Sequence, residues 1–435
     1  MALKRSPGSG ELLTHEQLYA MVDEHYYASD VPRSNGASLH PRVLLFSLVY
    51  PPDNYSGGAR PHRFSKYLQE LGYLVDVLAG GTAEQYIHDG NVHRVRAQLD
   101  HGIKNSLVER VFRRTLLPHD EGIAWIPRIV SFARRWRTDE CVIISTSPPF
   151  TTHLAALAAK KLYGWAWIAD FRDPLLGNPY RNNSVRTVDR MVERAIFRNA
   201  DALIANTDTV AELWRGKYPE HATKIHVIWN GFDPQETMCP APIPQQARRV
   251  LRHVGNIYGD RYPEMLLASL NRLIASGKCD PAAFCLDLVG PLETPGEGAS
   301  SDPWFRCDPN LVSKSEANRL ITEADYLLLL DVTKGNTGLQ VPAKTFDYIR
   351  IGRPILACTV RGSPVDRILT HSGVPYVGLY AGDSDEEIDR RVLTFLNFSN
   401  NPVEPSNWFQ RTFNGERQAE TLGKIVETVH RRSIR

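Results

Sequence analysis

The sequence predicts an α/β protein built from two Rossmann-like domains that face each other across a cleft. Short apolar segments alternate with longer amphipathic ones, a pattern typical of parallel sheets covered by helices. The alternation stops at residues 231–248, which contain four prolines and no apolar period, and it starts afresh after them. The 435 residues are enough for two or three domains of about 150 residues each. Loops at the carboxyl ends of the strands are therefore expected to line the cleft.

The strand-like segments divide between two halves of the chain. Those of the first half are residues 43–50, 74–79, 92–95, 141–146, 166–170, 202–206 and 225–229. Those of the second half are residues 250–254, 285–289, 326–330, 354–358 and 374–377. We therefore expect a polar leader at 1–40 with one short helix at 14–27, a first domain at 41–230, a linker at 231–248 and a second domain at 249–410. The last segment, 411–435, is expected to be a helix that packs back on the first domain.

The composition is that of an ordinary globular protein. Hydrophobic residues make up 42% and charged residues 23%, and a formal net charge of +2 gives no overall field for nucleic acid. The six cysteines form no C-x-x-C pair, so neither a zinc site nor a disulfide framework is indicated. No secretory signal and no apolar run of about 18 residues is present, which predicts a cytoplasmic protein. No cofactor and no metal are expected, since Asp170 and Asp173 form only a weak D-x-x-D signal.

The most informative segment is residues 335–354, which predicts an anion site at the start of a helix. Pro342 suits the first helical position, and Gly352 suits the position just past the end. Gly335 and Gly338 precede the helix and let the backbone turn tightly and approach a ligand. The free N–H groups and the positive dipole end of a helix N-terminus favour a phosphate at this place.

Two charged side chains on this helix suit a nucleotide. Lys344 lies in the first turn, where it adds a positive charge, and Asp347 lies three residues later on the same face. A carboxylate at that position could accept two hydrogen bonds from a ribose diol. The same spacing fits a surface helix with an incidental Lys–Asp pair, and the spacing alone does not separate the two interpretations.

The segment resembles the VPxK-x-F-[ED]-Y-x-x-x-G-x-P-[IV] signature of the retaining glycosyltransferases of family four, which have the GT-B fold. The resemblance implies that Asp347 holds the nucleotide ribose. It also implies that Lys344 and the backbone around Thr337, Gly338 and Leu339 face the donor diphosphate. This chain departs from the pattern twice. It has Asp where Glu is usual, and it has Leu339 where many members have a glutamate that contacts the transferred sugar.

Three segments of the first domain extend the resemblance. Gly57 and Gly58 follow the first strand, and the similar loop of the family approaches the donor phosphate or sugar; an ordinary βα turn is the other interpretation. Residues 146–153 (TSPPFTTH) follow a strand and open a helix, so we expect His153 to face the cleft as a catalytic candidate. A helix N-terminal histidine without such a role is the alternative. Asp170 opens the D-F-R-D-P block and is the second catalytic candidate, with a structural ion-pair cluster as its alternative.

The second domain opens with residues 253–261 (HVGNIYGDR). We expect a strand to end at Gly255 and Arg261 to reach the phosphates from the following turn. A guanidinium suits oxyanions because its donors form a fork. Asn256 stands where the family has the first of two basic residues, so the phosphate clamp is expected to depend on Arg261 and Lys344.

These motifs together predict a glycosyltransferase for a hexose or related sugar. Its donor is a nucleotide-diphosphate sugar, and its acceptor is a hydroxyl of a glycan or lipid-linked saccharide, as in polysaccharide biosynthesis. The resemblance implies retention of configuration, and the basic residues, glycine amides and helix tip are expected to stabilise the leaving phosphate without a metal. Two alternatives remain: a nucleotide-sugar epimerase or hydrolase on the same fold, and a non-catalytic protein that binds nucleotide sugars. A dehydrogenase is disfavoured because the G-x-G-x-x-G fingerprint is missing.

Two basic segments raise the question of membrane contact. Residues 108–114 and 128–137 mix arginines with apolar residues at helical spacing. This pattern suits a helix lying on an anionic membrane near a lipid-linked acceptor. It suits equally a helix that faces the core and has a solvated basic side. If the acceptor is lipid-linked, we therefore expect peripheral contact with the inner face of the membrane.

Overall fold

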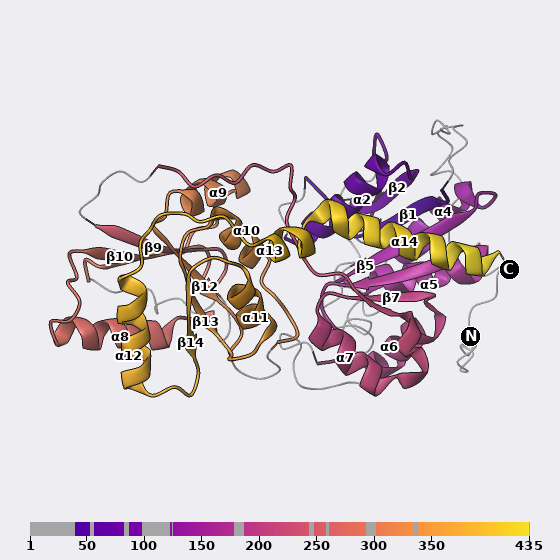
Figure 1. The fold of residues 1–435 in the computed structure, drawn as a ribbon. Coiled ribbons are helices and arrows are strands. Elements are labelled where there is room, and N and C mark those ends of the chain that lie inside the picture. The colour runs from indigo at the N-terminus through magenta and orange to yellow at the C-terminus, as the bar shows by residue number, and fades with distance from the viewer. Residues whose placement is uncertain are drawn as a thin grey trace, which may run out of the picture.

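The computed structural model describes residues 40–52, 56–81, 87–97, 122–123, 125–177, 187–242, 248–257, 261–292, 302–333 and 338–434. Within these ranges the chain forms two α/β domains that lie side by side (Figure 1). The predicted leader helix at 14–27 and the basic segment at 108–114 lie outside the described residues.

The first domain holds, in its described part, an eight-stranded sheet in the order β3-β4-β2-β1-β5-β6-β7-β8. Its neighbouring strands are parallel, apart from the antiparallel pair β3–β4. The strands are β1 (Arg42–Ser47), β2 (Val75–Gly81), β3 (Ile87–Asp89), β4 (Val92–Arg96), β5 (Cys141–Ser147), β6 (Ala166–Phe171), β7 (Ala202–Ala205) and β8 (Ile225–Val227). The helices are η2 (Ser56–Gly58), α2 (Ala59–Glu70), α4 (Trp125–Ala133), η3 (Arg134–Trp136), α5 (Thr151–Tyr163), α6 (Thr187–Asn199), α7 (Asp208–Lys217) and η4 (Pro219–Lys224).

The second domain holds, among the described residues, a six-stranded parallel sheet in the order β11-β10-β9-β12-β13-β14. The strands are β9 (Arg249–Val254), β10 (Phe284–Val289), β11 (Phe305–Asp308), β12 (Tyr326–Leu330), β13 (Ile355–Thr359) and β14 (Tyr376–Tyr380). The helices are α8 (Glu264–Ala275), α9 (Lys314–Thr322), α10 (Lys344–Ile351), α11 (Pro364–His371) and α12 (Asp385–Leu396), followed by α13 (Asn407–Thr412) and α14 (Gly415–Ser433). The predicted class, two Rossmann-like α/β domains, is confirmed.

The predicted strands are found with their ends displaced by a few residues, and two observed strands were not predicted. Those two, β3 and β11, are short strands at the edges of their sheets. In β11 buried and more exposed residues mix, and Arg306 and Asp308 are exposed. An edge strand of this kind lacks the continuous apolar run that marks a strand buried on both faces.

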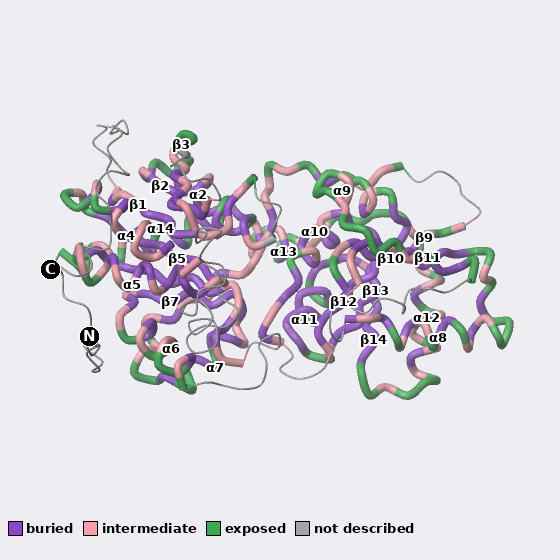
Figure 2. Tube along the Cα trace, turned by 180° about the vertical axis from the view of Figure 1, so that it is seen from behind, coloured by how far each residue is buried: buried purple, intermediate pink, exposed green. Residues whose placement is uncertain are grey.

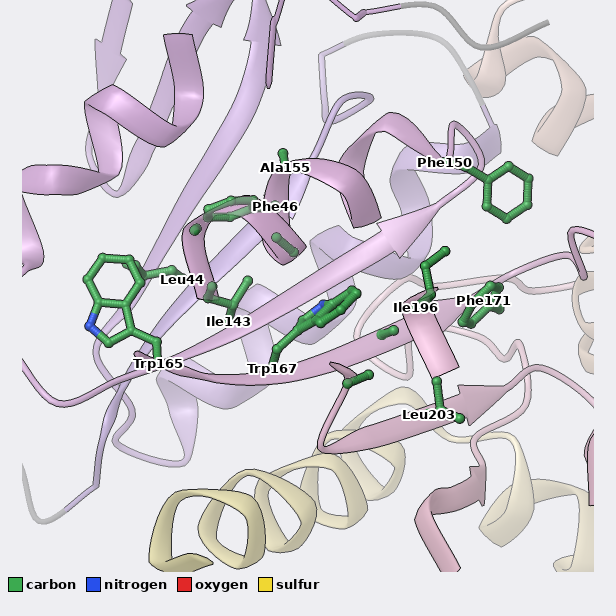
Figure 3. Close-up of a cluster of buried hydrophobic side chains, with 14 of the residues drawn as sticks. Leu44, Phe46, Ile143, Phe150, Ala155, Trp165, Trp167, Phe171, Ile196 and Leu203 are labelled. Atoms are coloured by element: carbon green, nitrogen blue, oxygen red, sulfur yellow. The ribbon is translucent and has the colours of Figure 1, made fainter. Parts of the chain in front are cut away.

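Period-two alternation divides the first sheet between two cores. Leu44, Phe46, Ile143 and Trp167 belong to the core on one face, drawn in Figure 3. Their chain neighbours Val43, Leu45, Val142 and Ile168 belong to the core on the other face. Both faces of a parallel sheet are therefore covered, as expected for doubly wound folds. Buried positions follow the strands, and exposed positions gather on helices and loops (Figure 2).

The C-terminal helix α14 crosses from the second domain onto the first (Figure 1). Its buried residues Leu422, Val426 and Val429 belong to the same core as β1 and β2. The hydroxyl of Tyr73 donates to Gly423 O at 3.1 Å, and a Cβ atom on Gly423 would lie 3.0 Å from that hydroxyl. The end of the chain thus joins the two domains a second time, beside the linker.

The linker is fixed by contacts to both domains. Phe232 N donates to Phe413 O at 3.0 Å, and Gly415 N donates to Phe232 O at 2.9 Å. Lys66 of α2 forms an ion pair of 2.9 Å with Asp233. The described part of this segment is therefore a hinge held between α2 and the turn that precedes α14.

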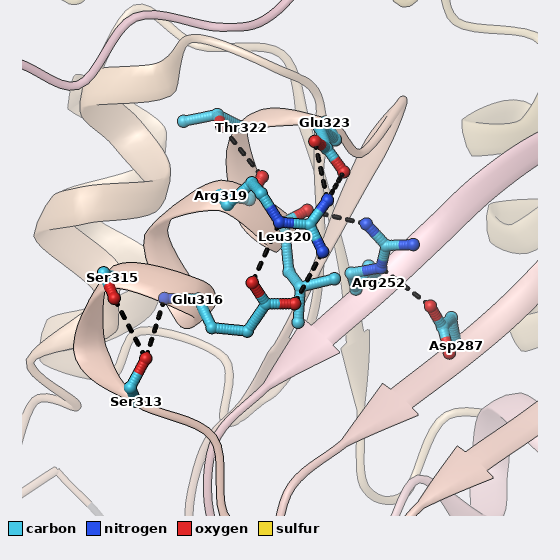
Figure 4. A network of polar contacts seen from close by, with 9 residues as sticks. All are labelled: Arg252, Asp287, Ser313, Ser315, Glu316, Arg319, Leu320, Thr322 and Glu323. Carbon is cyan, nitrogen blue, oxygen red and sulfur yellow. Dashed lines mark hydrogen bonds and ion pairs between the residues drawn. The ribbon is translucent and has the colours of Figure 1, made fainter.

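Strand β9, which carries part of the site, is held from the side of α9. Arg252 Nε bonds Asp287 of β10 at 2.7 Å, and its Nη1 donates to Leu320 O at 2.7 Å (Figure 4). Arg319 forms ion pairs with Glu316 and Glu323 on the exposed side of the same helix. Because Arg252 points to α9, the next residue of the strand, His253, points to the opposite face.

The predicted basic segment at 128–137 falls on the second half of α4 and on η3 after it. The apolar side of α4 is part of the core through Trp125, Ile129 and Phe132, and Arg134 and Arg137 beside it are exposed. Of the two interpretations, the described residues have the arrangement of a core-facing helix with a solvated basic side. None of the described helices combines the length and the apolar character needed to span a bilayer.

Candidate active site

Lys344 and Arg261, the two cations of the predicted phosphate clamp, lie together near the carboxyl end of β9. Lys344 begins α10, and its Nζ lies 3.0 Å from Nε2 of His253 in β9. Gly255 follows the strand with φ of +127°, and a Cβ atom there would lie 2.6 Å from Lys344 Nζ. A glycine is needed at this strand end, both for the backbone angle and to leave room for the ammonium.

The positive charges of Lys344 and Arg261 favour the binding of an anion at the end of β9. Burial, with a further contribution from the guanidinium of Arg261, lowers the pKa of Lys344 to about 7. Arg261 is itself buried. Two cations held near each other away from water each disfavour the charge on the other. A diphosphate bound between them would relieve this repulsion, which is the reason that perturbed pKa values gather at functional sites.

Arg261 also lies near one carboxyl group from each domain. Burial raises the pKa of Asp173, in the D-F-R-D-P block, and of Asp331, just after β12, to about 6, while Arg261 acts in the opposite direction on both. Asp173 forms a side-chain hydrogen bond with Gln340 of the second domain. Asp331 accepts hydrogen bonds of 2.8 Å from Thr359 Oγ1 and Val332 N. Asp173, Gln340 and Arg261 thus connect the two domains.

Asp347, the predicted ribose ligand, lies one turn after Lys344 on α10. Burial raises the pKa of its carboxyl group to about 6, as does the neighbouring Glu236, so the group is ionised at neutral pH. Within the described chain, its oxygens accept no side-chain or backbone hydrogen bond. A partly buried carboxylate with vacant acceptor positions is suited to a pair of hydroxyl donors.

The first domain contributes a cation to the same place. Arg63 of α2 is half-buried, and its pKa is lowered to about 10 by burial and by Arg60, while Asp347 and Asp233 act in the opposite direction. Arg63 was not among the predicted site residues. It belongs to the sequence A-R-P-H-R-F directly after the two glycines, where its one-turn spacing from Arg60 is the signal that could have found it.

The Gly57–Gly58 turn is held by Arg172. The guanidinium donates to Gly57 O and Pro148 O, and its Nε donates to Ser147 O at 3.2 Å. Gly58 caps α2 without a side-chain hydrogen bond. A Cβ atom on Gly57 would collide with the guanidinium. A larger residue at position 57 would therefore displace Arg172 from this turn, and the turn stays a candidate for phosphate binding through its backbone.

The expectation that His153 faces the cleft is corrected by the structure. Its side chain is 0% exposed, and Nδ1 lies 2.7 Å from Ser145 Oγ. The ring packs 4.4 Å from the ring of Phe171, centroid to centroid. Burial, together with Arg172, lowers its pKa to about 3, so the ring is neutral at physiological pH. His153 is a core residue at the start of α5 because aromatic side chains of β6 and the preceding turn close over it.

Asp170 is likewise placed in a structural role rather than at the surface of the cleft. It is 0% exposed and accepts hydrogen bonds from Arg60 Nη2 at 2.7 Å and Nε at 3.0 Å, and from Thr146 Oγ1 at 2.9 Å. Arg60 also donates to Ile228 O and Trp229 O at 2.8 and 2.6 Å. The pair ties α2, β6 and the start of the hinge together, which agrees with the ion-pair alternative. The partner in this pair is Arg60 of α2.

The loop before α10 shows a contact between the domains. Thr337 lies outside the described residues. Gly338 has φ of +82°, which explains its glycine. Leu339 is 7% exposed and belongs to the core of the first domain, although it is carried by the second. The side chain at the position of the family's glutamate is therefore buried in apolar packing.

Among the described residues, no three or more His, Cys, Asp or Glu side chains form a group that could hold a metal ion.

Comparisons with known proteins agree with the fold. Residues 59–236 match the family model described as Glycosyltransferase Family 4. The structure is similar to that of HepE from Anabaena in complex with UDP-glucose, at a TM-score of 0.52 and 13% identity over 91% of this chain and 98% of that one. It is also similar to the structure described as trehalose-6-phosphate from E. coli bound with UDP-2-fluoro glucose. There the TM-score is 0.58 and the identity is 12%, over 90% of this chain and 97% of that one.

A third similar structure is that of the lipopolysaccharide outer core galactosyltransferase WaaB in its apo form, with a TM-score of 0.54 and 12% identity over 89% of this chain and 99% of that one. No curated protein matches the sequence. The fold class is therefore GT-B, and the match to the family 4 model is confined to residues 59–236.

Proposed function

We propose that the protein transfers a sugar from a nucleotide-diphosphate sugar to an acceptor hydroxyl. One observation carries the proposal: Lys344, with Arg261 near it, lies at the end of β9, and the carboxylate of Asp347 follows one turn along α10. This spacing suits a diphosphate at the helix start and a ribose next to it. The family 4 domain match supports the reaction class.

The chemistry follows from where charge develops. As the bond from the sugar to the phosphate breaks, negative charge grows on the leaving diphosphate, and fixed cations stabilise it most in a site without water. We assign this task to Lys344 and Arg261, with the backbone of Gly57 and Gly58 facing them from the first domain. In the proposal these cations take the place of a metal. Retention of configuration, implied by the resemblance, is tested by the anomeric form of the product in an NMR spectrum.

A thermal-shift panel of UDP-, GDP-, ADP- and dTDP-sugars tests the donor. UDP-glucose is the first candidate, since similar structures are complexes with UDP-glucose and UDP-2-fluoro glucose. A donor present at about 100 times its dissociation constant adds about 2.7 kcal/mol to the folded state. One nucleotide class should stand out. If no member of the panel raises the melting temperature, the proposed donor site is refuted.

Turnover with and without acceptor separates transfer from the alternatives. A transferase releases the nucleoside diphosphate quickly only when an acceptor extract is present, because domain closure excludes water as an acceptor. Equal release without the extract would indicate a hydrolase. A changed sugar without release would indicate an epimerase, and binding without turnover would indicate a non-catalytic protein.

The proposed acceptor is a hydroxyl of a glycan or a lipid-linked saccharide, so we test contact with a membrane. The apolar side of α4 packs in the core, and the exposed guanidinium of Arg137 is the group that we expect lipid headgroups to contact. Charge alone gives weak binding that salt screens. We expect flotation with anionic liposomes at low salt and none at high salt. Absence of flotation at both would remove the membrane from the proposal and would leave the transferase intact.

Asp347→Ala should weaken nucleotide binding about 10- to 100-fold, because hydrogen bonds to a charged group contribute about 1.5–3 kcal/mol. Isothermal titration with the donor selected by the panel measures the loss. Glu316→Ala is the control, since Glu316 is a partly exposed carboxylate of the same domain that is paired with Arg319. Unchanged affinity in Asp347→Ala would show that the ribose lies elsewhere.

The affinity for the donor should depend on pH on both sides of neutrality. The ammonium of Lys344, with a pKa of about 7, binds phosphate only when charged, so affinity falls as the pH rises above 7. The carboxylate of Asp347, with a pKa of about 6, accepts ribose hydroxyls when ionised, so affinity falls as the pH drops below 6. A nucleotide sugar is the appropriate ligand, because it lacks the terminal phosphate group that itself titrates near 6. Asp347→Asn should abolish the acidic fall and keep the alkaline one.

A further inference from the structure

The strongest unassigned feature of the site is His253, which the sequence motifs left without a role. Its side chain is 1% exposed. Nδ1 lies 2.9 Å from Leu328 O, and a carbonyl oxygen only accepts, so Nδ1 carries the hydrogen. In the neutral ring the lone pair is then on Nε2, which lies 3.0 Å from Lys344 Nζ. An ammonium only donates, so the direction of this hydrogen bond is fixed as well.

The ring stays neutral under physiological conditions. Burial, followed by the charges of Lys344 and Arg261, lowers the pKa of His253 well below its usual value. Backbone hydrogen bonds to Leu328 and Gly255 act on this pKa in the opposite direction. The imidazole therefore keeps its acceptor position over the whole range in which Lys344 titrates. The main-chain carbonyl of β12 selects the tautomer, as is usual for a histidine that holds another group.

Two further contacts define where the ammonium lies. It rests against the backbone of Gly255, where a Cβ atom would be 2.6 Å from Nζ. One turn later on α10, the hydroxyl of Tyr348 accepts a hydrogen bond of 3.1 Å from Val254 N. Tyr348 thus already docks α10 on the end of β9. The contact from His253 goes to the charged end of Lys344 and adds a restraint on the cation.

On this geometry we propose that His253 is a positioning residue for the diphosphate site. It holds the Lys344 ammonium at the end of β9 in its charged form, ready for the donor phosphate. The inference rests on the proposed function, in which Lys344 binds the diphosphate. A cation fixed before the reaction needs no reorganisation as charge develops on the leaving group. It also offsets the repulsion by Arg261, which otherwise favours loss of the proton from Lys344.

The test uses the full-length protein and three variants. His253→Leu removes the acceptor, His253→Gln keeps an amide oxygen within reach of Lys344, and Tyr348→Phe removes a docking contact that involves no charge. Affinity for UDP-glucose and for inorganic pyrophosphate is measured by calorimetry from pH 6 to 9. Because pyrophosphate itself titrates in this range, each variant is compared with the wild type at every pH. The ammonium of Lys344 is titrated by NMR in protein labelled at the lysine Cε atoms, and Lys344→Met identifies its signal.

Binding is lost above a certain pH, and we expect His253→Leu to lower that pH by about one unit. At pH 8 it should weaken binding about tenfold. The NMR titration of Lys344 should move in the same direction. His253→Gln should restore most of the affinity at pH 8 and reverse most of the shift in the Lys344 titration. Tyr348→Phe should lower the melting temperature and leave the pH profile as it is, which separates docking of the helix from control of the charge.

Each failure has a distinct signature. If His253→Leu binds pyrophosphate with an unchanged pH profile while Lys344→Met weakens it, the inference is overturned and the proposed donor site stands. If Lys344→Met binds both ligands as the wild type does, the donor site itself is misplaced. The wild-type protein provides a check that needs no variant: ¹⁵N spectra of labelled histidine should show His253 with its proton on Nδ1, and a proton on Nε2 would overturn the inference.

Discussion

Lys344→Met is expected to lower the kcat of sugar transfer about 100- to 1000-fold, the usual loss when one preorganised donor to a developing negative charge is removed. Methionine keeps the length and apolar stem of the side chain, so the packing of α10 should survive. The ammonium is the group that His253 and Gly255 accommodate and that lies near Arg261. Donor binding should weaken as well, and the loss in kcat comes in addition to it, because the charge that Lys344 stabilises grows further in the transition state.

The matched control is Lys314→Met. Lys314 is an exposed lysine of the same domain that pairs with Glu236 at 2.8 Å, and its loss should leave turnover within about twofold. Steady-state kinetics with the donor selected by the panel measures both variants, and melting curves show that they are folded. A Lys344→Met enzyme with wild-type kcat would remove the central cation from the mechanism.

Asp170→Asn is expected to destabilise the protein by about 3–5 kcal/mol, because it leaves the buried guanidinium of Arg60 without its counter-charge. Both side chains are buried, and their forked hydrogen bonds fix α2 against β6. The loss should appear as a lower melting temperature and a lower urea midpoint of the first domain. Activity per folded molecule should change little, since neither side chain is exposed to a ligand.

A double replacement and a neighbouring carboxylate sharpen this prediction. Arg60→Met with Asp170→Leu removes both charges and should recover part of the stability that Asp170→Asn loses. Asp173→Asn is the control within the same D-F-R-D-P block, because Asp173 lies at the domain boundary near Arg261 and keeps a hydrogen bond to Gln340 when it becomes an amide. A stable but inactive Asp170→Asn would instead support the catalytic role expected from the motif.

The described fold was predictable largely because its signals are local. A parallel strand is buried on both faces, so segments such as 326–330 read as continuous apolar runs. Gly352 ends α10 with φ of +74°, a conformation that favours glycine and is visible in the sequence as a stop signal. The start of α10 is two residues later than Pro342 suggested, since Ala343 is the N-cap. The short edge strands β3 and β11 were not predicted, because three or four residues are too few to show a periodic pattern of apolar side chains.

The site was predicted unevenly for a related reason. Lys344 and Asp347 share a helix, so their spacing alone places them on one side of it. His153 and Asp170 lie at strand and helix ends, where a residue points either into the cleft or into the core. His153 points into the core because aromatic side chains pack around it, and Asp170 does so because Arg60 of α2 binds it. Both sets of partners come from other parts of the chain. Spacing within a motif contains no information about such partners.

By itself, the sequence determined two parallel α/β domains, the hinge between them and a helix with a cation in its first turn and an acid one turn later. These depend on periodicity and on glycine and proline, which act over a few residues. The tertiary structure alone decided which polar groups are free for a ligand. It buried His153 and Asp170, brought Arg63 near Asp347 from the other domain, and set His253 against Lys344. The free energy of a charged group depends on everything that surrounds it in space, and only the folded chain supplies those surroundings.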